Sequence, residues 1–271
     1  MVSLTPYRTL DISTPGDTNP SDPFDVTTLT VSDIRTIVVS DYNNSSVKSF
    51  FTRHDSDSYS ILKLTSFPWQ LAKVTHNKLA VTVPGSRTIV VFKVSPDLDQ
   101  QATIDTRVMY WGLTALDSST LVAGADYSSC VDILDLDGHV LRSIQAEDIG
   151  QDLLQEPDFL CSTTDGNILV VDSGSKSLFC MTTYGAVVFV YSHTEATSRD
   201  RPGGVTVTTS GLISFVDDKA HTLVQLTEKG EVVMKTAMPD ESKYNYFGLC
   251  SDEEHFYIAV RDKHVHVYNF A

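Results

Sequence analysis

Long hydrophobic runs are missing from this sequence of 271 residues. The longest uninterrupted apolar run is AVVFVY at 186–191, whereas a membrane-spanning helix needs about 20 apolar residues. The first residues, MVSLTPYRTLDIST, also lack the basic start and the apolar centre of a secretory signal. We therefore predict a cytoplasmic protein that makes no membrane contact.

Cysteine and positive charge are also scarce. The four cysteines are too widely spaced for a C-x-x-C metal site or a dense disulfide framework, so we expect all of them to be reduced. With 20 Lys and Arg against 35 Asp and Glu, the formal net charge is −15, which disfavours generic attraction to nucleic acid or anionic lipid. No G-x-S-x-G, phosphate-binding loop or H-E-x-x-H motif occurs either.

A repeat with a period near 44 residues runs through the chain. An apolar segment followed by a polar hairpin loop occurs six times, anchored at Asp41, Val83, Ala125, Asp172, Asp217 and Arg261. A short apolar segment precedes each copy, and a β-rich run follows the first five. Glycines such as Gly138, Gly185 and Gly230 mark tight hairpin tips, because glycine adopts positive φ without steric cost. Each unit is therefore predicted to be a four-stranded antiparallel meander.

Six such sheets around an axis predict an all-β fold, a six-bladed β-propeller in one domain over 1–271. The predicted blades span 23–64, 67–106, 109–146, 157–193, 201–238 and 244–271, the last completed by 7–14. The sixth unit lacks a fourth strand, whereas YRTLDIST at 7–14 is β-rich and unassigned, so we expect it to close the ring. Full burial of Leu10 and Ile12 would contribute roughly 1.5–3 kcal/mol each. Two stacked β-sandwiches, the alternative, would require no such period.

Two repeats resemble a known family. EPDFLCSTTDGNILVVDSGSKSLFCM and RPGGVTVTTSGLISFVDDKAHTLVQL are similar to NHL repeats, with a Pro-x-Gly-Val-like opening and an apolar strand ending in Asp. Propellers of this kind resemble the C-terminal domains of tripartite-motif (TRIM) ubiquitin ligases. The resemblance implies a monomeric recognition domain that selects the ligase substrate, is not itself an enzyme and needs no cofactor.

The predicted binding face combines aromatic residues near the starts of inner strands with basic residues of the hairpin loops. Its partner-binding residues are Trp69, Arg87, Tyr110, Trp111, Lys176, Lys219, His221, Tyr246, Phe247, Arg261 and Lys263. We favour a protein or peptide partner, because aromatic residues and Arg dominate interface hot spots. Single-stranded RNA, held by phosphate contacts and base stacking, is the alternative. Trp69 and Trp111 filling gaps between blades is a third interpretation.

An enzymatic alternative is a metal-dependent propeller hydrolase. Asp25 and Asp158 open blades one and four, on opposite sides of a six-fold ring, and Asn245 could assist them on an axial ion. His264 and His266 alternate on one strand and share a face, but their spacing implies no third ligand. Packing explains that pair better, and no metal site is predicted.

Overall fold

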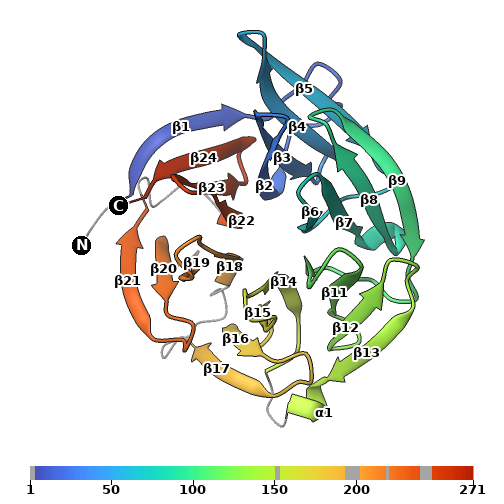
Figure 1. Ribbon diagram of the computed structural model, residues 1–271, viewed down its shortest axis with the longest axis vertical. Helices are drawn as coiled ribbons and strands as arrows, with labels where there is room; N and C mark the ends of the chain where they lie inside the picture. Colours follow the sequence, from blue (N-terminus) through green and yellow to red (C-terminus); the bar gives the residue numbers. More distant parts are fainter. Residues whose placement is uncertain (1–3, 150–152, 193–201, 218–219, 239–245, 271) are drawn as a thin grey trace.

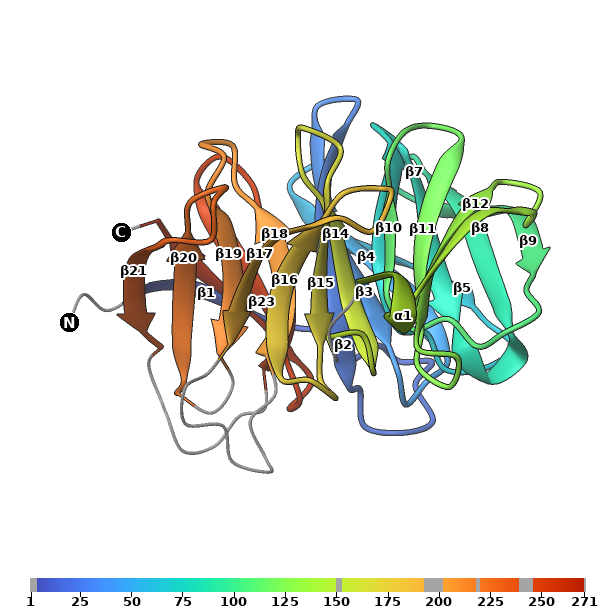
Figure 2. The same ribbon diagram turned by 90° about the horizontal axis from the view of Figure 1, so that it is seen from below.

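Six four-stranded antiparallel sheets surround a central axis in the computed structural model, which describes residues 4–149, 153–192, 202–217, 220–238 and 246–270 (Figure 1). Seen from the side, the strands of each blade run between the two faces of a disc (Figure 2). The predicted six-bladed all-β propeller is confirmed.

The first three blades follow the chain from the axis outward. Blade 1 comprises β2 (Pro23–Val31), β3 (Ile34–Asp41), β4 (Ser46–Arg53) and β5 (Ser56–Lys63). Blade 2 comprises β6 (Leu71–Thr75), β7 (Lys78–Val83), β8 (Thr88–Val94) and β9 (Leu98–Asp105), with the 3-10 helix η1 (Pro84–Ser86). Blade 3 comprises β10 (Leu113–Ala115), β11 (Thr120–Ala125), β12 (Cys130–Asp135) and β13 (Val140–Gln145).

The helix α1 (Ala146–Ile149) leads into the second half of the ring. Blade 4 comprises β14 (Pro157–Ser162), β15 (Ile168–Asp172), β16 (Ser177–Met181) and β17 (Val187–Ser192). Blade 5 comprises β18 (Pro202–Val207), β19 (Ile213–Asp217), β20 (Thr222–Leu226) and β21 (Val232–Ala237). Blade 6 comprises β22 (Tyr246–Ser251), β23 (His255–Val260), β24 (His264–Asn269) and β1 (Thr5–Asp11).

The N-terminal strand completes blade 6, as predicted. β1 pairs antiparallel with β24, from Thr5 opposite Asn269 to Asp11 opposite His264. Most of β1 is exposed and Leu10 is only half-buried, whereas Ile12, just beyond the strand, is fully buried. The contribution expected from full burial therefore applies to Ile12 and not to Leu10.

A buried lysine also holds the N-terminal segment against blade 1. Lys48 Nζ lies 2.7 Å from the carboxylates of both Asp17 and Asp41, and it donates to the carbonyl of Ile12 at 3.0 Å. Lys48 and Asp41 are inaccessible to solvent. Removing one partner of a buried ion pair costs about 3–5 kcal/mol because the other charge is left uncompensated, so loss of a single member of this cluster should weaken the attachment of the N-terminal segment.

The aspartate that ends the second strand of several repeats has a structural role. Asp172 accepts hydrogen bonds from the backbone N–H groups of Gln155, Glu156 and Ser175, at 2.7–2.9 Å. In blade 1, Asp41 accepts from the N–H of Asp22 at 3.0 Å. Each carboxylate thus ties its blade to the loop that leads into the same blade.

Burial in blade 4 is greatest in its two middle strands and lower in its inner and outer strands. The middle strands β15 and β16 are buried along their whole length, because each lies between two neighbouring blades. The outer strand β17 alternates half-buried and exposed residues. Among the described residues, no helix is long and apolar enough to cross a membrane.

Candidate functional site

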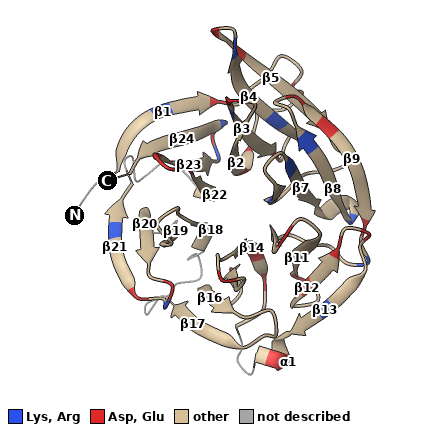
Figure 3. Ribbon diagram, in the orientation of Figure 1, with Lys and Arg blue, Asp and Glu red and all other residues tan. Residues whose placement is uncertain are grey.

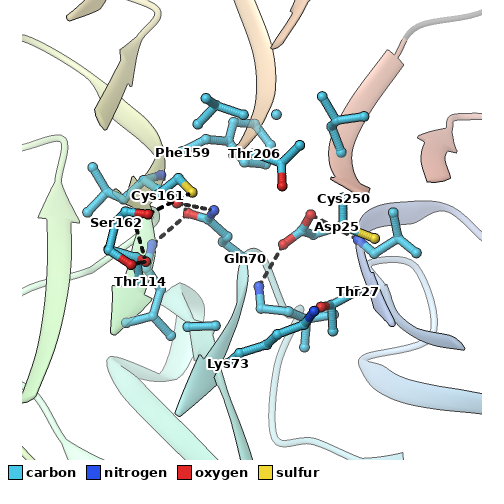
Figure 4. A pocket seen from close by; sticks show the side chains of 18 of the residues that line it. Asp25, Thr27, Gln70, Lys73, Thr114, Phe159, Cys161, Ser162, Thr206 and Cys250 are labelled. Carbon is cyan, nitrogen blue, oxygen red and sulfur yellow. Dashed lines mark hydrogen bonds between the residues drawn. The ribbon is translucent and has the colours of Figure 1, made fainter. Parts of the chain in front are cut away.

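The inner strands of all six blades converge on a central channel with a cavity of about 230 Å³ (Figure 4). Side chains of β2, β6, β10, β14, β18 and β22 line it. Three layers follow one another along the axis, and they differ sharply in chemistry: a cluster of rings, a polar layer and an open end.

Rings close the channel where the inner strands begin. Phe24 is at the centre, with its ring centroid 3.7 Å from that of Trp69, 4.3 Å from that of Phe247 and 6.4 Å from that of Phe159. Trp111 packs edge-on against Trp69 at 4.4 Å. We call these five residues the aromatic mouth. Phe24 and Phe159 are buried, whereas the other three rings are half-buried and offer an accessible face.

Hydrogen bonds fix one of the mouth's tryptophans. Trp69 Nε1 donates to the carbonyl of Asp158, in blade 4, at 3.2 Å. The backbone carbonyl of Trp69 accepts a hydrogen bond from Ser40 Oγ at 2.8 Å. Trp69 therefore joins three blades, and its ring is held rigidly across the axis.

Directly beneath the rings, Gln70 braces three blades. Its Oε1 accepts from the N–H groups of Leu113 and Leu160, at 2.6 and 2.8 Å, and its Nε2 donates to the carbonyl of Leu160 at 2.7 Å. Figure 4 shows the side chain reaching across the cavity towards Cys161 and Ser162. A buried amide is tolerated here because these three contacts satisfy it.

Asp25 occupies the same layer on the blade 1 side. Its Oδ2 accepts from the N–H of Leu71 at 2.8 Å, and its Oδ1 accepts from the N–H of Val26 at 2.9 Å. The carboxyl group is buried, and burial raises its pKa to about 7 although both hydrogen bonds act to lower it. Gly248 packs against it so closely that any Cβ there would overlap Asp25. The channel thus holds a carboxyl group that titrates near neutral pH.

The opposite end of the channel is open and polar. Hydroxyl groups of all blades but blade 2 line it, and Lys73 of β6 is exposed there. The N–H of Ser162 donates to Thr114 Oγ1 at 3.0 Å, which ties blade 4 to blade 3. Burial raises the pKa of the Cys161 thiol to about 11 and that of the Cys250 thiol to about 12, so neither supplies a thiolate near pH 7.

The structure brings some of the predicted binding residues together and separates others. Trp69, Trp111 and Phe247 meet at the aromatic mouth. Tyr110 and Tyr246, expected beside them, are instead core residues. The Tyr110 hydroxyl bonds to Asp132 in the interface of blades 2 and 3, and burial raises its pKa. Tyr246 packs between blades 5 and 6.

Lys and Arg positions are scattered among Asp and Glu positions around the ring (Figure 3), and two of the predicted basic residues pair with carboxylates. Arg261 Nε lies 3.4 Å from a carboxylate oxygen of Asp22, and Lys263 Nζ lies 2.8 Å from one of Asp11. Arg87 is exposed in the loop of blade 2, Lys176 is half-buried in that of blade 4, and the half-buried His221 ring lies 6.0 Å from the ring of Tyr246. Lys219 lies outside the described residues.

The layout of an axial metal site is not observed among the described residues. Asp25 lines the cavity but Asp158 does not, and no second carboxylate joins Asp25 in the described lining. Asn245 lies outside the described residues. Sequence reasoning identified Asp25 but missed the bracing role of Gln70. The sequence does carry a signal for such a residue. A polar residue directly follows an aromatic one near the start of an inner strand in both Phe24-Asp25 and Trp69-Gln70.

Neither a family model nor a curated protein matches this sequence. Solved structures share its fold. A catalytically inactive variant of virginiamycin B lyase from Staphylococcus aureus, with quinupristin, has a TM-score of 0.69 at 11% identity, covering 97% of this chain and 99% of that one. Kuenenia stuttgartiensis hydrazine synthase has a TM-score of 0.65 at 18% identity, covering 95% and 79%. A Bacteroides thetaiotaomicron protein of unknown function has a TM-score of 0.65 at 14% identity, covering 98% and 73%.

These similarities establish the propeller fold and correct one prediction. The prediction that the propeller is not an enzyme is wrong. Propellers of the same architecture include lyases, so the architecture does not exclude catalysis. At 11% identity, the likeness transfers no catalytic residue to this chain. The NHL and TRIM resemblance receives no support from these structures. The fold and site define a six-bladed propeller with a channel closed by rings at one end, a form suited to a binding module.

Proposed function

We propose that this protein binds a protein or peptide partner at the aromatic mouth. The observation that carries the proposal is the group of half-buried rings that close one end of the channel, namely Trp69, Trp111 and Phe247. Tyr42 and Phe67 extend it, with Phe67 6.1 Å from Trp111 and 4.8 Å from Tyr42. Tyr and Trp anchors dominate interface hot spots, and rings already held by their neighbours lose little entropy on binding.

The charges around the mouth favour a protein over RNA. Two of the predicted phosphate-binding residues, Arg261 and Lys263, are paired with Asp22 and Asp11. The net charge of −15 opposes a polyanion as well. A role in a TRIM-type ubiquitin ligase has no support from the comparisons, and the proposal does not need it.

Peptide selection tests this proposal. Peptides selected from a random display library on the immobilised propeller should bind through apolar side chains. Trp111→Ala should then weaken binding at least about 30-fold, which corresponds to about 2 kcal/mol. Tyr184, an aromatic residue 74% exposed in the turn between β16 and β17, is the matched control, and Tyr184→Ala should leave affinity unchanged.

Thermal unfolding of both variants checks that the fold persists. Unchanged peptide affinity in Trp111→Ala would overturn the proposal. The RNA alternative would be supported instead if the protein bound no peptide but bound a single-stranded oligonucleotide, with a log affinity that falls linearly with log salt concentration.

A second candidate is acid–base catalysis in the channel. It is favoured by Asp25, a buried carboxyl group with a pKa of about 7 that lines a cavity, since a general acid or base works best when its pKa lies near the operating pH. Quinupristin, the compound present with the inactive lyase variant, is the first substrate to try, followed by mass spectrometry. Turnover should vanish in Asp25→Asn and show an apparent pKa near 7 in the wild type. Absence of quinupristin turnover by the wild type would reject this candidate activity on that compound, and turnover unchanged in Asp25→Asn would reject acid–base catalysis by Asp25.

A further inference from the structure

Blade 6 carries a group of metal-ligating side chains away from the channel. His264 and His266 alternate along β24, and Asp262 lies in the hairpin loop just before it. One ligand atom from each of the three residues lies within 4.8 Å of the other two. The sequence spacing implied no third ligand for the two histidines, and the turn supplies one.

Hydrogen bonding leaves two of these atoms free. Asp262 Oδ1 lies 3.0 Å from His264 Nδ1, yet their alignment is not that of a hydrogen bond. Neither atom has a hydrogen-bond partner among the described residues, although both are shielded from water. The two atoms form an ion pair with each other when His264 is protonated. With a neutral imidazole both lack a partner, and buried polar atoms almost always have one. A cation would satisfy both atoms at once, provided that the histidine nitrogen is deprotonated.

The third residue is already oriented. His266 Nδ1 lies 3.1 Å from the hydroxyl oxygen of Tyr268, two residues further along the same face of β24. When Nδ1 donates to that hydroxyl, the lone pair of the imidazole is on Nε2. Metal-binding histidines commonly have their second nitrogen held in this way.

We propose that Asp262, His264 and His266 bind a divalent transition-metal ion of the Zn²⁺ type. Two imidazoles and one carboxylate suit zinc, and three protein ligands leave a fourth position for water. Ligand atoms about 2.0–2.1 Å from a tetrahedral ion lie about 3.3 Å apart, close to the 3.0 Å between Asp262 Oδ1 and His264 Nδ1. Small side-chain rotations bring in the third ligand.

A second group of similar composition provides the comparison. Asp135, Asp137 and His139 also lie within 4.8 Å of one another, in the turn between β12 and β13. There, Asp135 already accepts from the N–H groups of Asp137 and His139, at 3.0 and 2.9 Å, and it lies 3.0 Å from His139 Nδ1. Its oxygens are occupied and its residues are more exposed, so we expect no metal there.

Metal binding would stabilise blade 6 beside the strand pair that closes the ring. β24 pairs with β1, and His264 and His266 are opposite Asp11 and Thr9 in that pairing. An ion that joins β24 to the preceding loop binds the folded protein more tightly than the unfolded chain, so the stabilisation grows with the logarithm of its concentration above the dissociation constant. We therefore expect Zn²⁺ to raise the thermal midpoint.

Titration of the chelator-treated 271-residue protein with Co²⁺ and Zn²⁺ tests the site. We expect one Co²⁺ per chain, with a visible absorption spectrum of low coordination number, and a Zn²⁺-dependent rise in thermal midpoint. His266→Ala and Asp262→Asn should weaken binding at least about 100-fold, and Tyr268→Phe about tenfold, because removing an oriented neighbour typically costs 10–100-fold. His139→Ala should bind as the wild type does.

Circular dichroism shows which variants fold. Asp262 is in a loop, so Asp262→Asn decides the question if a histidine variant fails to fold. The proposal is overturned if the wild type binds no stoichiometric ion, or if His139→Ala weakens binding as much as Asp262→Asn does.

Discussion

The two ends of the central channel are built from the same six strands, but they differ in the size and polarity of the side chains that line them. At the first end, Phe24, Trp69 and Phe247 fill the axis with rings. At the other, hydroxyl groups and Lys73 leave the channel open. Because the six inner strands enter at the same end, residues at one height form a layer across the axis. The size and polarity of each layer then decide whether the channel is closed or open.

Asp25 and Gln70 form the boundary between the two ends. Their side-chain oxygens accept hydrogen bonds from backbone N–H groups of inner strands in other blades: Asp25 from Leu71, and Gln70 from Leu113 and Leu160. The interblade hydrogen bonds of Asp25 and Gln70 therefore lie directly beneath the rings, whereas the bond from Ser162 to Thr114 joins two blades at the open end. Four substitutions would break or sharpen this contrast.

The largest effect is expected where the boundary layer is most tightly packed. Gly248→Ala would place a Cβ on Asp25, overlapping its backbone as well as its carboxylate, so the free energy of unfolding should fall by about 4–5 kcal/mol. Urea denaturation measures it. Gly16, with no atom within 4 Å of its would-be Cβ, is the control, and Gly16→Ala should change little. Equal stability of the two variants would show that this contact is not tight.

The carboxyl group of Asp25 should make stability depend on pH. Its pKa of about 7 in the folded protein exceeds its ordinary value of 3.8, so the protonated form stabilises the fold below about pH 4, and that contribution is lost as pH rises to about 7. From pH 4 to pH 8, the wild type should lose up to about 4 kcal/mol relative to Asp25→Asn, which cannot ionise. Urea unfolding of both proteins at the two pH values measures it, and parallel pH profiles would contradict the assignment.

Loss of the Gln70 brace should cost about 3 kcal/mol. Gln70→Leu removes three hydrogen bonds and leaves buried backbone groups of Leu113 and Leu160 without partners. Gln101, exposed on the outer strand β9, is the matched control, and Gln101→Leu should stay within about 0.5 kcal/mol of the wild type. A small effect at both positions would mean that water replaces the brace.

The smallest effect is expected at the open end. Lys73→Met removes an exposed charge, so the free energy of unfolding should change by less than about 0.5 kcal/mol. Thermal and urea unfolding check this value. A loss above about 1 kcal/mol would show that the open end is constrained like the boundary layer, and the contrast between the ends would disappear.

The binding face predicted from the sequence and the aromatic mouth of the structure contain different residues, and the physical reason is the direction of each side chain. Trp111 and Tyr110 are neighbours in the chain, but side chains of adjacent residues in extended backbone point in opposite directions. Trp111 therefore packs at the mouth, whereas Tyr110 enters the interface of blades 2 and 3. The repeat pattern predicted that both rings lie near the start of an inner strand. It did not predict the direction in which each ring points.

Long-range contacts set a similar limit. The hydrogen bonds of Gln70 join it to residues 43 and 90 positions further along the chain, so no local motif marks the brace. For His264 and His266, the strand spacing correctly placed both on one face. Asp262 joins them only because the hairpin loop turns its side chain back, a feature of the loop rather than of the strand.

The sequence alone determined the number of blades and the closure of the ring, because a period near 44 residues and a missing last strand are properties of order along the chain. Tertiary structure decided which side chains meet on the axis, how deeply Asp25 is buried and which charges are already paired. Those features depend on the packing of six sheets against one another. Packing brings together residues that lie far apart in the sequence, and no sequence motif marks which of them will meet.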